Sequence, residues 1–218
     1  MFDALFTTTT EYQKLSHALS GKGACALFGL PASGRAQVYA ALCRQLDKPL
    51  CIVTPGEAEA TRFAADLNTL GIPAAVFPAR DYVLRPIEGT AREYEYRRLA
   101  VLGELVGGRL RAVAVPAEAL TQFTTPKEDF CANTRTLHAG DTLLRDDLLA
   151  ALFGAGYTRR AQVDGPGQFS VRGDIVDIFA PDQKMPVRME FWGDEIDTLH
   201  TFDLTTQRRE DAIDKFYL

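Results

Sequence analysis

Two glycines and an arginine between an apolar run and a helical pattern could form a phosphate-binding loop. The stretch from Gly29 to Ala36 has the spacing of a Walker A loop, Gly-x-x-x-x-Gly-Lys-Ser/Thr, and Gly34 supplies its second glycine. Such a loop directs backbone N–H groups and a lysine at phosphate and a hydroxyl at Mg²⁺. Here Arg35 replaces the lysine and Ala36 replaces the hydroxyl, so the metal has no ligand. We interpret the loop as a tight strand-to-helix connection without nucleotide chemistry, and we expect no cofactor.

A run of alternating apolar and polar residues in the second half presents an arginine. Residues 165–179 alternate at period two, as half-buried antiparallel strands do, and residues 188–197 repeat the pattern. Gly173 interrupts the first run, which predicts a bulge or a close backbone approach, and Gly193 predicts a hairpin tip. Arg172 stands just before Gly173, so its guanidinium could point out of the sheet. The pattern predicts a small sheet that presents arginine to a partner.

The first half of the chain must position the loop, and its pattern is that of an α/β domain. Short apolar runs predict strands, and apolar residues at helical spacing between them predict helices. Strands that alternate with helices of this length indicate a parallel sheet. A capping box of Thr54 and Glu57 is expected to start one helix, and Thr90 and Glu93 another. The strands are expected at 24–28, 50–53, 74–77 and 111–115.

The pattern changes near residue 124 and becomes mostly β from Tyr157 onward. A strand is expected at 134–137, followed by a helix capped by Asp141 or Thr142, with Leu144, Leu148 and Leu152 facing inward. That combination predicts a small α+β module with an antiparallel sheet. The aromatic residues of its strands are expected in the core, since such side chains usually face inward on an alternating strand. They are Phe169, Phe179, Phe191 and Trp192.

Composition excludes several classes of function. The 218 residues are 46% hydrophobic and 24% charged, which is ordinary for a globular protein with a core. Residues 1–123 carry 13 basic and 12 acidic side chains, whereas residues 124–218 carry 11 and 17, so the second part is a poor general binder of nucleic acid. No apolar run approaches the roughly 20 residues that cross a bilayer. The four cysteines lack metal-binding spacing, and we expect a reduced, cytoplasmic protein with no membrane partner.

The motifs at 157–159, 167–179, 186–197 and 202–208 resemble the N-terminal region of the bacterial transcription-repair coupling factors (Mfd). They are also similar to the excinuclease family of UvrB, which keeps a working Walker A loop. The resemblance implies a helicase-like, P-loop-type α/β domain at 1–123 that lacks its second half. It further implies a module at 124–207 that binds the excinuclease protein UvrA, and a segment at 208–218 that returns toward the first domain.

The resemblance also implies which side chains contact UvrA. Arg159 matches the family's Tyr-x-Arg, Arg172 its Val-Arg-Gly, and Phe179 the aromatic residue that ends the strand. The alternative is that both arginines pair with the module's own acids, such as Asp174 or Asp177, and only solubilise the sheet. For Arg188, a second arginine within the strands, internal pairing is the preferred interpretation.

These implications define the expected function and its alternatives. We expect a non-catalytic part of a coupling factor that recruits UvrA to nucleotide excision repair during transcription-coupled DNA repair. RNA polymerase and DNA are expected to bind only parts outside these residues, and the rest of its own chain is a further partner. One alternative is an ATP-dependent, DNA-binding fragment of the UvrB type. Another is a purely structural module.

Overall fold

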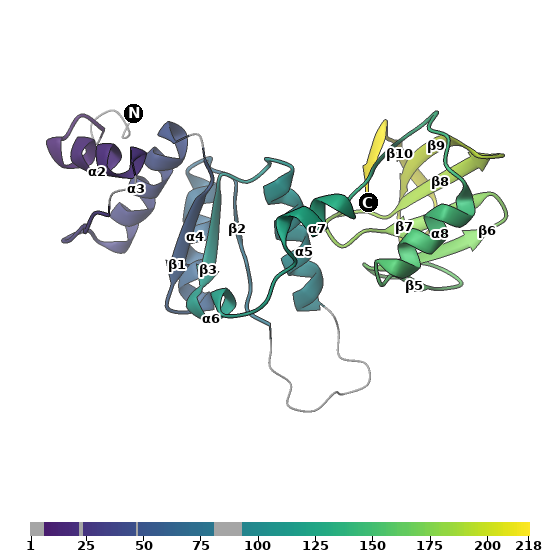
Figure 1. Ribbon diagram of the computed structural model, residues 1–218, viewed down its shortest axis with the longest axis horizontal. Coiled ribbons are helices and arrows are strands. Elements are labelled where there is room, and N and C mark those ends of the chain that lie inside the picture. The colour runs from purple at the N-terminus through teal and green to yellow at the C-terminus, as the bar shows by residue number, and fades with distance from the viewer. Residues whose placement is uncertain (1–6, 22–23, 47, 81–92) are drawn as a thin grey trace, which may run out of the picture. The chain divides into compact units, whose positions relative to one another are not determined.

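The computed structural model describes residues 7–21, 24–46, 48–80 and 93–218, and the chain divides into two units near residue 123 (Figure 1). One unit comprises Met1–Tyr94 and Val101–Phe123, and the other comprises Glu95–Ala100 and Thr124–Leu218. We call the second unit the module. No helix among the described residues is long and apolar enough to span a membrane.

The first unit is built around a three-stranded parallel sheet, which confirms the predicted α/β pattern. Its strands β1 (Leu50–Thr54), β2 (Ala74–Val76) and β3 (Ala112–Pro116) lie in the order β1-β3-β2. Helices α3 (Ala32–Gln45) and α4 (Glu57–Thr69) bury alanines of β3 on one face of the sheet. Helices α5 (Glu93–Val106) and α6 (Ala117–Leu120) supply side chains that pack with the valines of β3 on the other face.

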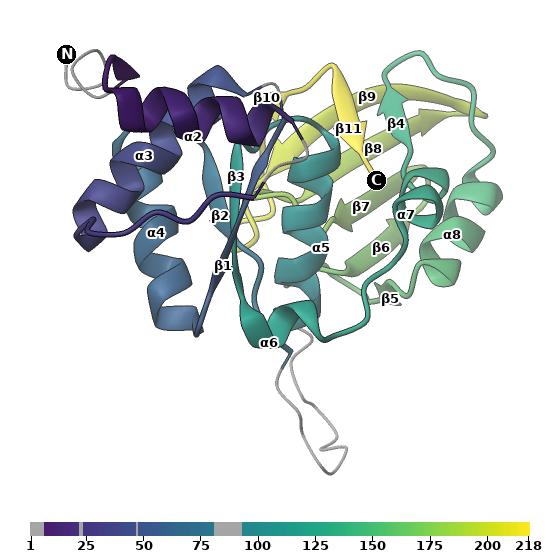
Figure 2. The same ribbon diagram turned by 60° about the vertical axis from the view of Figure 1, so that its left-hand side comes forward.

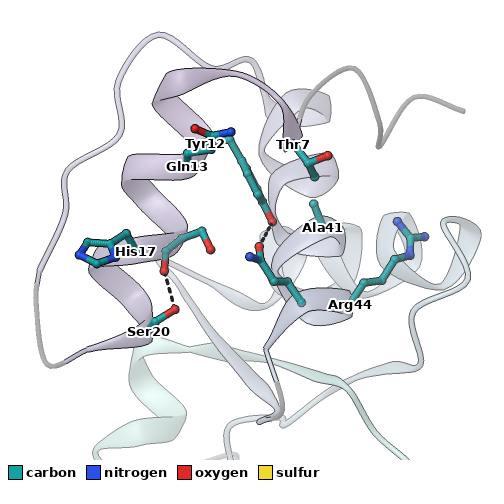
Figure 3. Close-up of a pocket in the computed structure, with 9 residues that line it drawn as sticks. Thr7, Tyr12, Gln13, His17, Ser20, Ala41 and Arg44 are labelled. Atoms are coloured by element: carbon teal, nitrogen blue, oxygen red, sulfur yellow. Dashed lines mark hydrogen bonds between the residues drawn. The ribbon is translucent and has the colours of Figure 1, made fainter.

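An N-terminal helix, α2 (Thr10–Ser20), packs on α3 through a small apolar cluster that includes Tyr12. The Tyr12 hydroxyl donates a hydrogen bond of 2.9 Å to Oε1 of Gln45 at the end of α3 (Figure 3). Beside this bond lies an open cavity of about 560 Å³, lined mostly by polar side chains of the two helices. The helix therefore adds to the α3 side of the first unit rather than to its sheet.

Two expectations for the first unit were wrong. Residues 24–28 are not a strand: they are exposed, and Phe28 is 88% exposed. An apolar run forms a strand only where a neighbour completes its hydrogen bonds, and within the described residues no strand pairs with it. Helix α4 begins at Glu57 after Gly56, and the Thr54 hydroxyl donates to the Gly56 carbonyl instead of capping the helix. The second capping box involves Thr90, which lies outside the described residues.

The module contains a six-stranded sheet in the order β10-β9-β8-β7-β6-β5, antiparallel except for the β5–β6 pair (Figure 2). This confirms the predicted α+β module. Two helices, α7 (Lys127–Ala132) and α8 (Arg145–Gly154), precede the sheet, and α8 starts after Leu144 without the expected Asp141 or Thr142 cap. The strands are β4 (Thr136–His138), β5 (Thr158–Arg159), β6 (Gln168–Arg172), β7 (Ile175–Phe179), β8 (Val187–Trp192), β9 (Glu195–Phe202), β10 (Arg209–Ala212) and β11 (Lys215–Tyr217).

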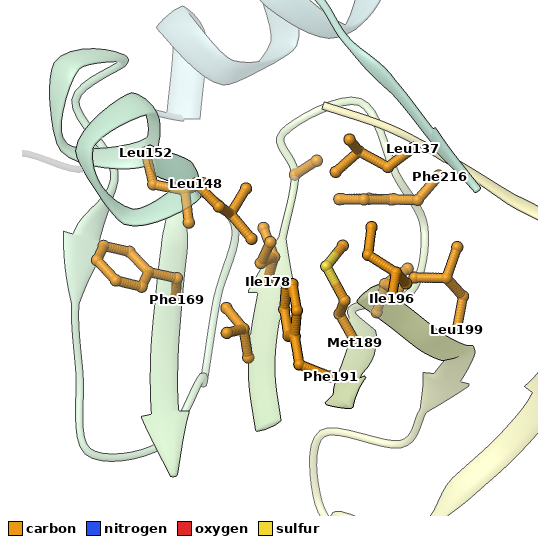
Figure 4. Packing of buried hydrophobic residues seen from close by; sticks show 13 residues of the cluster. Leu137, Leu148, Leu152, Phe169, Ile178, Met189, Phe191, Ile196, Leu199 and Phe216 are labelled. Carbon is orange, nitrogen blue, oxygen red and sulfur yellow. The ribbon is translucent and has the colours of Figure 1, made fainter. Parts of the chain in front are cut away.

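One face of this sheet carries the module's main core (Figure 4). Leu148 and Leu152 of α8 are fully buried against it, as expected from their spacing. Leu144 was expected on the same inward side, but it precedes the helix and is 53% exposed. Phe169, Ile178 and Met189 meet them from three neighbouring strands. The alternation that predicted half-buried strands thus places one side of each strand in this core.

Gly173 is the first residue of a tight turn, not a bulge within one strand. Arg172 pairs with Ile175 across it, so residues 165–179 contain two strands, β6 and β7. Gly173 has φ +60°, a conformation that glycine adopts without strain, at the first central position of a two-residue turn. Gly193 has φ +64° at the expected hairpin tip between β8 and β9.

The last eleven residues form strands within the module. β10 pairs with β9, and β11 pairs with β4. Phe216 of β11 is buried in the main core beside Leu137. The resemblance implied that residues 208–218 return toward the first domain. In the structure this segment supplies core contacts to the module.

Candidate protein-binding face

The other face of the module's sheet is lined by polar side chains, and we call it the polar face. Alternation along the strands places these side chains opposite the main core, and the strand register brings them side by side. Hydrogen bonds between side chains link Ser170 and Arg172 to Asp177, and Thr198 to Glu190. The polar face comprises Ser170, Arg172, Asp177, Arg188, Glu190, Thr198 and His200.

Asp177 is the centre of the polar face, and its carboxylate is completely buried. Arg188 donates to it from Nε to Oδ1 at 2.7 Å and from Nη2 to Oδ2 at 3.0 Å. These bonds raise the pKa of the Arg188 guanidinium above its already high value. The Arg188 guanidinium also lies 4.7 Å from the Phe202 ring centroid and donates to the Gln207 carbonyl. Arg188 is therefore a structural arginine, as expected.

A turn after β9 holds the Gln207 carbonyl in place for Arg188. The Asp203 carboxylate accepts hydrogen bonds from the N–H groups of Thr205 and Thr206, and these bonds lower the pKa of Asp203. Gln207 has φ +59°, and its N–H donates to the Asp203 carbonyl. The turn thus extends the polar network beyond the strands.

Arg172 shares Asp177 with Arg188 but lies at the rim of the polar face. Its Nη2 donates to Oδ2 of Asp177 at 2.5 Å, while its side chain remains 46% exposed. Both interpretations of Arg172 thus have structural support: it pairs with an acid of the module, and it also reaches solvent. Asp174, the other suggested acid, lies instead 3.4 Å from Arg145.

Arg159 lies on the edge strand β5 and is exposed. It pairs with Phe169 in the parallel register, so it shares the face of the main core and not the polar face. Neither Arg159 nor Arg160 has a side-chain hydrogen bond or ion pair to any described residue. The structure therefore does not bring Arg159 and Arg172 onto one face of the sheet. Alternation instead places the exposed Arg160 on the same side as Arg172.

Phe179 and Trp192 differ in exposure. Phe179 is 7% exposed and packs with Val163 and Phe202, so it lies beneath the surface and offers little area to a partner. Trp192, expected in the core, is 83% exposed. Its position beside Gly193 at the hairpin tip was the sequence signal that could have indicated exposure.

The residues of the Walker-like loop lie mostly within a helix. Helix α3 begins at Ala32, so Gly34, Arg35 and Ala36 are helical, and the Arg35 N–H donates to the Pro31 carbonyl. Arg35 lies 3.7 Å from Glu59, and Ala36 is buried in the core. A Cβ on Gly34 would meet the Pro31 ring at 3.3 Å, a tight contact that favours glycine here. Gly29 precedes the helix with φ +80°.

Known proteins are similar both to the module and to the chain as a whole. A family model described as the UvrB interaction domain matches residues 136–218, which form most of the module. The transcription-repair-coupling factor of Mycobacterium tuberculosis is 36% identical over 96% of this chain. That of Myxococcus xanthus is 34% identical over 85% of this chain. That of Bacillus subtilis is 29% identical over 84%. The chain spans only 16–17% of the length of these relatives.

The module therefore falls in the class of UvrB interaction domains. The chain as a whole is related to the N-terminal region of bacterial transcription-repair-coupling factors, which confirms the recognition made from its motifs.

Proposed function

We propose that the module binds UvrA and thereby connects nucleotide excision repair to transcription. The family match to a UvrB interaction domain and the relationship to transcription-repair-coupling factors support this proposal. The observation that carries it is the position of Arg172, which is half exposed while Arg188 already neutralises the buried Asp177. Arg172 can therefore reorient toward a carboxylate of UvrA without leaving Asp177 unpaired.

Arg159 adds a second cation at the β5 edge of the same sheet. An exposed guanidinium with no bond to any described residue loses little on binding, and its planar fork can grip a carboxylate with two bonds. Phe179 supports this surface indirectly. It packs on Phe202, whose ring lies against the Arg188 guanidinium. UvrA would thus contact the rim and the edge of the sheet around β5 and β6.

The test is to measure binding of UvrA to the full 218-residue chain by calorimetry and gel filtration. Replacing either Arg172 or Arg159 with alanine is expected to cost about 1–4 kcal/mol of binding free energy. Arg62→Ala is the matched control, since Arg62 is an exposed arginine on α4 of the first unit. Unchanged affinity of both variants would reject the assigned residues, and no complex with the parent chain would reject the function.

We further propose that the first unit is a helicase-like, P-loop-type domain without nucleotide chemistry, so that the chain is non-catalytic by itself. The replacement of the lysine by Arg35 and of the metal-binding hydroxyl by the buried Ala36 supports this. The alternative, an ATP-dependent DNA-binding part of a UvrB-type protein, requires MgATP to bind here. Calorimetry with MgATP is expected to detect no heat of binding, and saturable binding at micromolar concentration would favour the alternative.

ATP-dependent DNA translocation and contacts with RNA polymerase belong, in this proposal, to regions of the full-length relatives outside these residues. The small share of the relatives that the chain spans is consistent with that assignment. In keeping with this role in DNA repair, we also propose a cytoplasmic location.

A further inference from the structure

Trp192 is the only tryptophan of the chain, and its indole is almost completely exposed. Other aromatic residues of the same sheet are buried, namely Phe169 on β6, Phe191 on β8 and Phe202 on β9. An exposed aromatic ring lacks the stabilisation that its buried neighbours obtain from the core. Tryptophan is also enriched among the residues that dominate binding at protein interfaces. Trp192 therefore requires an explanation that the core does not supply.

The register places Trp192 on the polar face, at the same end as Arg172. Phe191 points into the main core (Figure 4), so the next residue of β8 lies on the opposite side of the sheet. Arg172 pairs with Ile175, which pairs with Glu190, two residues before Trp192. Two strand spacings and two residues separate the backbones of Arg172 and Trp192 by about 12 Å.

The backbone that carries Trp192 is held firmly. The Phe191 N–H donates to the Asp174 carbonyl at 2.8 Å, which joins the two hairpin tips. The Leu143 N–H donates to the Asp194 carbonyl at 2.7 Å, and Thr142 forms a β-bridge with Glu195. A ring on such a support is presented to a partner at a small entropic cost, because no loop has to be ordered.

The charge of the polar face indicates what kind of partner fits. The module is acidic, but on this face the charges are balanced: Arg172 and Arg188 stand against Asp177 and Glu190, and Glu195 pairs with Trp192 in the register of β8 and β9. Asp177 is neutralised by Arg188, and Glu190 is neutralised by Arg209, which reaches over from β10. Arg172 bonds to the same Asp177 from the rim and remains half exposed. The complementary partner surface offers one carboxylate to Arg172 and, next to it, an apolar recess to Trp192.

We infer that Trp192 is the aromatic anchor of the UvrA-docking face, inserting into an apolar recess of the partner while Arg172 meets a neighbouring carboxylate. This inference rests on the proposed function and extends it from the arginines to the hairpin tip of β8 and β9. Tryptophan and arginine are, together with tyrosine, the side chains enriched among the residues that dominate binding at protein interfaces. Ile175, which lies between them in the register, adds apolar surface.

The single tryptophan allows a direct test. The chain is labelled with 5-fluorotryptophan, which gives one ¹⁹F resonance, and unlabelled UvrA is added. We expect the resonance to shift and broaden, and its response to dissolved paramagnetic oxygen to fall, as the ring leaves water. Trp192→Ala is expected to weaken binding at least tenfold in calorimetry, and Trp192→Phe less.

Phe123→Ala is the matched control, because Phe123 is a 99% exposed aromatic residue at the end of the first unit. Its affinity for UvrA is expected to be unchanged. If the parent chain binds UvrA while the ¹⁹F resonance stays as in the free protein and Trp192→Ala binds equally well, the inference is wrong and the proposed function stands. If the parent chain forms no complex, both are wrong.

Discussion

Arg188 grips Asp177 through both carboxylate oxygens, with Nε 2.7 Å from Oδ1 and Nη2 3.0 Å from Oδ2. Arg172 bonds to the same carboxylate from the rim. The two arginines thus share one acid, but only Arg172 reaches solvent to a large extent. This arrangement divides their tasks: one arginine holds the sheet together, and the other remains accessible to a partner.

The first prediction compares the stability of two arginine variants. Arg188→Met removes the buried partner of Asp177 and is expected to lower the free energy of unfolding by about 3–5 kcal/mol, because a buried charge is left poorly compensated. Arg172→Met removes a half-exposed cation and is expected to cost no more than about 1 kcal/mol. Urea unfolding followed by circular dichroism measures both. Equal losses would contradict the division of tasks.

A double variant tests the origin of that loss. Asp177→Leu combined with Arg188→Met removes both charges, so no buried ion remains without a partner. Most of the stability lost in Arg188→Met is expected to return, since apolar replacements of buried ion pairs are often neutral. A double variant no more stable than Arg188→Met would show that packing, not charge, dominates.

A second prediction concerns the main core. Leu152 is completely buried between α8 and the sheet, and Leu152→Ala is expected to lower the free energy of unfolding by about 3–5 kcal/mol. Leu144, the exposed residue before α8, is the matched control, and Leu144→Ala is expected to change stability by less than about 0.5 kcal/mol. Similar losses in both variants would mean that α8 does not cover this core.

Much of the fold followed from local pattern, whereas most of the polar face did not. Alternation predicted the strands, and helical spacing identified Leu148 and Leu152 but wrongly included Leu144, which precedes α8 and is exposed. Gly173 was ambiguous, because glycine serves both a bulge and a tight turn, and only the pairing of Arg172 with Ile175 distinguishes them.

The pairing of side chains across strands is where sequence gives least information. Asp177 and Arg188 are eleven residues apart, and their contact depends on the register of β7 against β8. Trp192 was expected in the core because alternating aromatics usually face inward, yet it lies on the opposite face at a hairpin tip. Residues 24–28 failed as a strand because periodicity cannot tell whether a neighbouring strand is present to complete hydrogen bonds.

A third prediction concerns thiol reactivity. Cys43 is buried in α3, and its Sγ lies 3.4 Å from the Arg111 carbonyl oxygen. Burial raises the pKa of its thiol, although Arg111 and Arg44 partly oppose this. Since the thiolate is the reactive form, iodoacetamide is expected to label Cys43 only in urea, and the exposed Cys131 in the native protein. Mass spectrometry of the peptides measures both, and equal native labelling would contradict the burial.

The last prediction concerns alkaline pH. Burial, with a smaller effect of Asp182, raises the pKa of the Tyr157 phenol above its ordinary value of 10.0. The unfolded chain then ionises at this residue before the folded chain does. The stabilising contribution is complete below pH 10 and is lost as pH rises from there toward the folded pKa. The free energy of unfolding is therefore expected to fall by up to about 1.4 kcal/mol per pH unit from this group.

Tyr157→Phe isolates that effect, because phenylalanine keeps the ring but cannot ionise. Other tyrosines and lysines titrate in both proteins and cancel in the difference. Urea unfolding at pH 8, 9.5 and 10.5 is expected to give a shallower loss of stability in Tyr157→Phe than in the parent chain. Spectrophotometric titration at 295 nm is expected to lose one late-ionising phenol. Parallel stability profiles for the two proteins would mean that Tyr157 ionises equally easily in the folded and unfolded chains.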